Sequence, residues 1–122
     1  MINYMVISMK SYIYILELDN NKYYIGTSTD PQKHIDAHFN SQGPAWTIMN
    51  KPIKVLAIIP DCSDVYKYTK IYMKKYGIEN VRGGTFSSIV LDEQAMKTLK
   101  KMKKNSRSIY KRFFRFFMKQ CS

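Results

Sequence analysis

The sequence predicts an α+β domain in which a small antiparallel sheet of three strands is flanked by helices. Two runs rich in Tyr, Ile and Leu, separated by turn-favouring residues, predict a β-hairpin over residues 11–26. A run over residues 53–59 that is apolar except for Lys54 has the length of a third, buried strand. Capping residues and helical periodicity predict helices over about residues 30–40 and 65–76.

Composition favours a polyanionic partner. The 122 residues include 20 Lys and Arg against 9 Asp and Glu, which gives a formal net charge of +11. An excess of this size indicates nucleic acid first and an anionic membrane surface second. No apolar run approaches the roughly 20 residues that span a bilayer, so no membrane-spanning helix is expected. We rank nucleic acid above a membrane as the partner.

The cysteines and the N-terminus bear on localisation. Cys62 and Cys121 are far apart and lack the spacing of metal ligands, so we expect free thiols in a reducing, intracellular compartment. Residues 1–10 are apolar but have no basic start followed by a small-residue cleavage site. We expect an extra strand or a loose arm there, not a signal peptide.

The hairpin carries an aromatic residue and an isoleucine near the end of each strand. Asp19-Asn20-Asn21 can adopt the left-handed backbone that a tight turn requires. At Gly26 a side chain would block a close backbone approach or a positive φ. The alternative is a tyrosine-rich hairpin whose rings only pack on a core, because strands favour tyrosine in any case.

Two histidines follow the hairpin on one face of the first predicted helix. Asp30 can cap this helix, and Pro31 suits its first turn. His34 and His38 are four residues apart, which places them on the same helical face. Residues 41–52, which contain Gly43-Pro44-Ala45-Trp46-Thr47 with the only tryptophan, are expected to form a loop, and residues 78–86 are expected to form a second, glycine-bearing loop.

In this arrangement the chain resembles the GIY-YIG nuclease domain over residues 11–91. The resemblance implies that Tyr14 and Tyr24 are the two motif tyrosines, with Tyr24 orienting or deprotonating the attacking water. It also implies that His38 occupies the family's His/Tyr position and that His34 stands where the family has an arginine. These four residues are the predicted catalytic residues, and we expect Tyr14 and Tyr24 on neighbouring antiparallel strands with both hydroxyls within reach of His38.

Two departures from the family pattern weaken the catalytic signal. His34 lacks the planar fork with which an arginine binds phosphate, and a histidine's charge at pH 7 depends on its surroundings. The family's metal-binding glutamate is implied on the helix after Pro60, but residues 65–78 contain no Asp or Glu. Asp64 and Glu79 are the nearest acids. We therefore expect no metal and no cofactor, and Mg²⁺ only if the protein is an active endonuclease.

Residues 67–86 resemble a segment that follows the nuclease core in family members from large DNA viruses, which would allow a virion-associated role. Many of those proteins continue with a zinc knuckle. Its four ligand positions fall here on Ser108, Lys111, Phe116 and Cys121. One ligand in four cannot hold tetrahedral zinc, so we expect at best a relic of the knuckle.

Residues 92–122 are predicted to form a basic, amphipathic, helical extension. Ten of the 20 Lys and Arg lie between Lys97 and Lys119, and Met96, Leu99 and Met102 form an apolar stripe. Three interpretations stay open: a solvated basic face, a helix that binds a phosphate backbone, and an interfacial membrane helix. The residues predicted to bind nucleic acid are Lys97, Lys100, Lys101, Lys103, Lys104, Arg107, Lys111, Arg112 and Arg115.

Two functions fit the sequence. The favoured one is a catalytically impaired GIY-YIG-like protein that acts as a basic nucleic-acid-binding or structural, assembly protein. Its partner would be DNA, an acidic protein surface or a larger assembly. The alternative is an active, metal-dependent GIY-YIG endonuclease that cleaves DNA phosphodiester bonds. The loss of the glutamate, the arginine and the knuckle ligands together favours the first.

Overall fold

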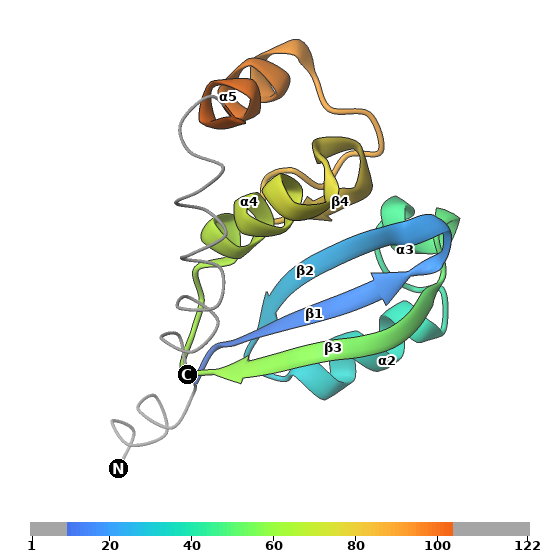
Figure 1. The fold of residues 1–122 in the computed structure, drawn as a ribbon. Coiled ribbons are helices and arrows are strands. Elements are labelled where there is room, and N and C mark those ends of the chain that lie inside the picture. Colours follow the sequence, from blue (N-terminus) through green and yellow to red (C-terminus); the bar gives the residue numbers. More distant parts are fainter. Residues whose placement is uncertain (1–9, 104–122) are drawn as a thin grey trace.

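The computed structural model describes residues 10–103. They form a four-stranded mixed sheet in the order β3-β1-β2-β4, with helices on both faces (Figure 1). The predicted α+β class is confirmed, but the sheet has four strands instead of three. The strand or arm expected over residues 1–10 falls almost entirely outside the described residues.

The predicted hairpin is present. Strands β1 (Tyr12–Leu18) and β2 (Lys22–Ser28) pair antiparallel and are joined by the short 3₁₀ turn η1 (Asp19–Asn21). Asn20 and Asn21 have φ of 64° and 57°, a left-handed conformation that asparagine tolerates. The turn residues therefore fix the register of the two strands.

The third strand is longer and more exposed than predicted. Strand β3 (Pro52–Pro60) pairs with β1 and forms one edge of the sheet. Ile53, Val55 and Ile58 are 53%, 37% and 42% exposed, so the prediction of a buried strand is wrong. A short apolar run indicates a strand, but it does not say whether that strand lies at the centre or the edge.

The fourth strand lies in a stretch that was expected to be a glycine-bearing loop. Strand β4 (Val81–Gly83) follows the 3₁₀ turn η2 (Ile78–Asn80) and pairs parallel with β2. With only three residues, β4 gives no periodic pattern in the sequence. All three of its residues are buried.

Helices cover the two faces of the sheet in different ways. On one face lie α2 (Pro31–Phe39) and α3 (Ala45–Met49), of which α3 falls within the predicted loop. On the other, α4 (Val65–Tyr76) packs against β2 and β4, and α5 (Glu93–Lys103) lies beyond α4 (Figure 1). Each face has its own core: Tyr14, Leu16, Leu18, Ile35 and Trp46 on the α2 side, and Ile13, Ile15, Ile25, Tyr68, Ile71 and Leu99 among those on the α4 side.

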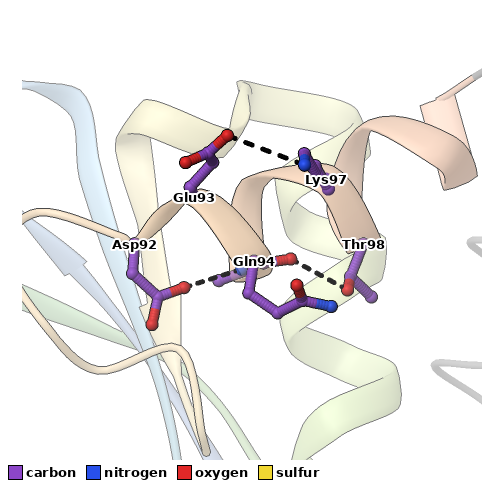
Figure 2. A network of polar contacts seen from close by, with 6 residues as sticks. Asp92, Glu93, Gln94, Lys97 and Thr98 are labelled. Carbon is purple, nitrogen blue, oxygen red and sulfur yellow. Dashed lines mark hydrogen bonds and ion pairs between the residues drawn. The ribbon is translucent and has the colours of Figure 1, made fainter.

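Helix α5 begins at a well-formed N-terminus. The Asp92 carboxylate accepts from the Ala95 N–H at 2.7 Å, and Glu93 pairs with Lys97 at 3.6 Å (Figure 2). Leu99 is buried, as the predicted apolar stripe requires. Residues 104–122, the rest of the predicted helix, lie outside the described residues, and the division of the chain at residue 92 stays a prediction.

Two further features concern localisation. None of the described helices is long and apolar enough to cross a bilayer. Cys62 is disulfide-bonded, so the prediction of a free thiol at this position is wrong. That prediction used separation along the chain, which carries no information about distance in the fold. Cys121 lies outside the described residues.

Candidate functional site

The four residues predicted as catalytic lie together around one hollow on the α2 side of the sheet. Strands β1 and β2 supply the tyrosines, α2 supplies the histidines, and the loop before α3 closes the remaining side. The hollow has a volume of about 390 Å³ and is lined by Tyr14, Tyr24, Lys33, His34, Ala37, His38, Gln42, Gly43 and Pro44.

The strand register places both tyrosines on the same face. Tyr14 pairs with Gly26 and Leu16 pairs with Tyr24, and residues two apart on a strand point the same way. The ring centroids of Tyr14 and Tyr24 are 6.3 Å apart. Had the two rings lain on opposite faces, they could not have shared a site.

The histidines meet the tyrosines from one side of α2. The His34 ring lies 6.4 Å from the Tyr14 ring, and the His38 ring lies 4.9 Å from the Tyr24 ring, measured between centroids. Tyr14 Oη is 2.9 Å from His38 Nε2, a hydrogen-bonding distance. The sequence predicted that both hydroxyls reach His38. The Tyr14 hydroxyl makes this hydrogen bond, whereas Tyr24 contacts His38 through its ring.

A chain of hydrogen bonds runs inward from Tyr14. His38 Nδ1 lies 3.0 Å from Thr47 Oγ1, and that hydroxyl donates to the Pro44 carbonyl at 3.1 Å. A hydroxyl has one proton, so Thr47 accepts from His38 Nδ1–H. His38 is therefore protonated on Nδ1, and its Nε2 accepts the proton of the Tyr14 hydroxyl.

Burial keeps the groups of this chain neutral. His38 and Thr47 are 3% and 0% exposed. Burial, helped by the nearby His34, lowers the pKa of His38 from 6.5 to about 4. Burial, and secondarily the neighbouring Tyr24, raises the pKa of Tyr14, and burial also raises the pKa of Tyr24. At neutral pH the site thus presents uncharged phenols and an uncharged imidazole.

Two glycines make room for the chain. A Cβ at residue 26 would overlap Cζ and Oη of Tyr14, and a Cβ at residue 43 would overlap His38 Nδ1 and lie 2.7 Å from Thr47 Oγ1. Gly26 is not among the residues with positive φ. Close approach of the tyrosine ring, and not backbone freedom, therefore explains the glycine at this position.

Some of these residues were missed by the sequence analysis. Lys33 lines the hollow, and it lies one position before His34 on α2. Thr47 and Gly43 belong to the Gly-Pro-Ala-Trp-Thr segment noted only as a loop. Because Lys33 is next to His34 in the sequence, its place near the hollow could have been predicted. Nothing in the sequence indicates the contact between Thr47 and His38.

The hollow does not fit a divalent metal ion. Its lining offers phenols, imidazoles, an ammonium and an amide, whereas Mg²⁺ prefers carboxylate oxygens. Helix α4, where a glutamate was implied, packs on the other face of the sheet. Asp64 accepts from the Lys67 N–H at the start of that helix. Within residues 10–103, no three His, Cys, Asp or Glu side chains gather as a metal site would require.

Arg82, to which the sequence assigned no role, is part of the structural framework. Its guanidinium is 4.5 Å from the Trp46 ring centroid, and the residue is 5% exposed. It donates at 2.7–2.9 Å to the main-chain carbonyls of Ile78, Val81, Ser88 and Ile89. These bonds fill the fork that would otherwise bind a phosphate, so Arg82 fastens the segment after β4 to the core.

The predicted nucleic-acid-binding residues lie away from the hollow or outside the described part. Lys97, Lys100 and Lys101 are exposed on α5, on the α4 side of the sheet. Nothing is described of the Lys103 side chain, nor of Lys104, Arg107, Lys111, Arg112 and Arg115. Their role in binding stays a prediction.

Comparison with known proteins identifies the family. A family described as "GIY-YIG catalytic domain" matches residues 10–82. The UPF0213 protein spr1390 of Streptococcus pneumoniae strain R6 and a UPF0213 protein of Streptococcus pneumoniae serotype 4 strain TIGR4 are each 34% identical over 47 residues. The match covers 38% of this chain and 48% of each relative, so the chain spans about half the length of these relatives. No solved structure gives a significant match.

Proposed function

This chain belongs to the GIY-YIG catalytic domain family, and from that premise we propose that it is a nucleic-acid-binding domain with little or no hydrolytic activity. The observation that supports this most strongly is the donor set of the hollow. It keeps the two tyrosines and His38 but has no carboxylate to hold a metal ion. Metal-assisted hydrolysis needs that ion to polarise the phosphate and to generate the nucleophile.

The hollow suits a phosphodiester group as a ligand. Lys33 supplies an ammonium, Tyr24 supplies a neutral phenol, and His34 supplies a ring N–H, all of which can donate to phosphate oxygens. Contacts of this kind hold a backbone without reading bases. The net charge of +11 steers a polyanion to the surface over a longer range.

The basic extension is proposed to add further backbone contacts. Changing Lys100, Lys103, Lys104 and Arg107 to Gln should flatten the logarithmic salt dependence of duplex binding by roughly 3 to 4 units, since each contact contributes about 0.9. An unchanged slope in this variant, together with loss of a protein partner when Phe113 and Phe117 are changed to Ser, would mark the extension as an assembly element. DNA as the preferred nucleic acid, a viral origin and association with a virion stay predictions.

Binding at the hollow is tested with Lys33→Gln. We expect weaker binding of a fluorescein-labelled duplex, followed by anisotropy, and a salt slope lower by about 0.9. Lys51→Gln removes the same charge from an exposed position that does not line the hollow. Equal effects of the two variants would show that the hollow is not the binding site.

The active endonuclease is the second candidate, and the hydrogen-bond chain favours it. A water molecule oriented by Tyr24 could give its proton to Tyr14 Oη while Tyr14 passes its own proton to His38 Nε2, 2.9 Å away. However, this step forms an imidazolium where burial has lowered the pKa of His38 to about 4. At pH 7 that costs roughly 4 kcal/mol, and no metal ligand is present to offset it. The impaired protein therefore remains the better-supported proposal.

A further inference from the structure

Helix α4 carries four lysines and no acidic residue. Lys67, Lys70, Lys74 and Lys75 lie within its twelve residues. The first three follow at spacings of three and four, so they form one stripe along the helix. Like charges at this spacing destabilise a helix by a few tenths of a kcal/mol per pair. The stripe therefore gathers positive charge along one side of α4, which suits an anionic ligand.

An aromatic ring lies on the same side of α4. Tyr66 is 38% exposed, whereas Tyr68, Ile71 and Tyr72 on the opposite side are buried in the core. The Tyr66 ring stacks on Phe86, with centroids 5.5 Å apart and an interplanar angle of 30°. One face of the ring is thus supported by the protein.

The Tyr66 ring also contacts a lysine, which a nucleobase can displace. Lys70 Nζ lies 3.9 Å from the ring centroid. A cation–π contact at an exposed site contributes about 0.5–1 kcal/mol, and a nucleobase stacked on an aromatic ring contributes about 1–3 kcal/mol. A base can therefore take the place of the ammonium, which then moves to a neighbouring phosphate.

We propose that the surface formed by Tyr66, Lys67, Lys70 and Lys74, the α4 surface, binds a segment of single-stranded nucleic acid. Lysines hold the phosphates, and Tyr66 stacks on a base, which only an unpaired strand exposes. Helix α4 and helix α2, which lines the Tyr14–His38 hollow, lie on opposite faces of the sheet (Figure 1). This surface is therefore separate from the hollow.

The neighbouring helix extends the positive surface. Leu99 of α5 packs into the same core as Tyr68 of α4, which brings the two helices together. Lys100 and Lys101 are exposed on α5, and its acidic residue Glu93 pairs with Lys97. An acidic protein could meet the charges of this surface, but it would make no use of the stacked ring.

The charge requirement is tested on the full chain with a fluorescein-labelled oligo(dT) of about twelve nucleotides, by anisotropy over a range of NaCl concentrations. In Lys70→Gln/Lys74→Gln we expect a salt slope lower by about 1.4, because each contact with a single strand contributes about 0.7. Lys51→Gln/Lys54→Gln is the matched control, because it removes two exposed lysines at or beside the opposite edge strand. Equal slopes in the two double variants would overturn the proposal.

The stacking requirement is tested at Tyr66. Tyr66→Ala should weaken binding of oligo(dT) about tenfold and leave duplex binding unchanged, whereas Tyr66→Phe should retain both. Thermal unfolding of each variant checks that the fold is intact. If Tyr66→Ala weakens single strands and duplexes alike, the assignment to a single strand is wrong. The result for Lys33→Gln does not depend on this outcome, so the two proposals fail separately.

Discussion

Tyr14 lies opposite Gly26 in the β1–β2 ladder, and its hydroxyl occupies the space that a side chain at residue 26 would fill. Because residue 26 has no side chain, the Tyr14 hydroxyl can lie close to the sheet and still reach His38 Nε2 at 2.9 Å. Gly26 is thus part of the site, because it sets the position of the Tyr14 hydroxyl on the neighbouring strand.

Replacing Gly26 should therefore damage both stability and the site. We expect Gly26→Ala to lower the free energy of unfolding by about 1–3 kcal/mol, since the new Cβ displaces the Tyr14 ring from a buried position. Urea denaturation measures the loss. Thr27→Ala, at the exposed next position on β2, is the control and should change stability little. Equal losses in the two variants would contradict the assignment of close contact at residue 26.

Thr47 should fix the tautomer of His38. In the wild type we expect imidazole ¹⁵N chemical shifts of a protonated Nδ1 and an unprotonated Nε2. Thr47→Val keeps the shape but removes the acceptor, which leaves a buried donor unpaired at a cost of about 1–3 kcal/mol and releases the tautomer. Thr47→Ser should restore the wild-type shifts. A wild-type His38 protonated on Nε2 would refute the hydrogen-bond chain.

The pH dependence of stability should carry the signature of a buried neutral histidine. Burial lowers the pKa of His38 from 6.5 to about 4, so between these values the unfolded chain binds more protons than the folded one. Stability should thus be complete above about pH 6.5 and fall by up to about 3 kcal/mol as the pH drops to 4. Chemical denaturation across this range, compared with His38→Gln, measures it. The same acid sensitivity in both proteins would exclude His38 as its source.

Arg82 should matter for folding and not for binding. In Arg82→Lys the planar fork is lost, and several main-chain carbonyls, most of them partly buried, lose their donor, so we expect about 3 kcal/mol of destabilisation. Urea denaturation measures it, with the exposed Lys101→Ala as control. A variant that folds normally but binds DNA poorly would instead place Arg82 in the binding site.

Much of the fold could be predicted because local signals agreed with it. Asp64 and Gly77 mark the ends of α4, and the predicted helix has the observed bounds. The position of β3 at the edge and the existence of β4 depend on strand order, which no local pattern contains. The same holds for Cys62, whose bond depends on the path of the whole chain.

The site was predictable for a related reason. Tyr14, Tyr24, His34 and His38 were found because their spacing along strands and a helix determines which way they point. Thr47 contacts His38 across a loop, and that contact depends on tertiary packing. The tyrosines and histidines of the hollow could therefore be located from the sequence, but Thr47, which accepts a hydrogen bond from His38 Nδ1, could not.

Cleavage of DNA separates an impaired nuclease from an active one most directly. The wild-type protein and Tyr24→Phe should each be incubated with plasmid and branched DNA in the presence of Mg²⁺ or Mn²⁺, at concentrations where binding is established. Because the hollow lacks a carboxylate, we expect no cleavage above the protein-free background in either case, with binding retained. Metal-dependent cleavage by the wild type that is lost in Tyr24→Phe would contradict this and identify the protein as an active endonuclease.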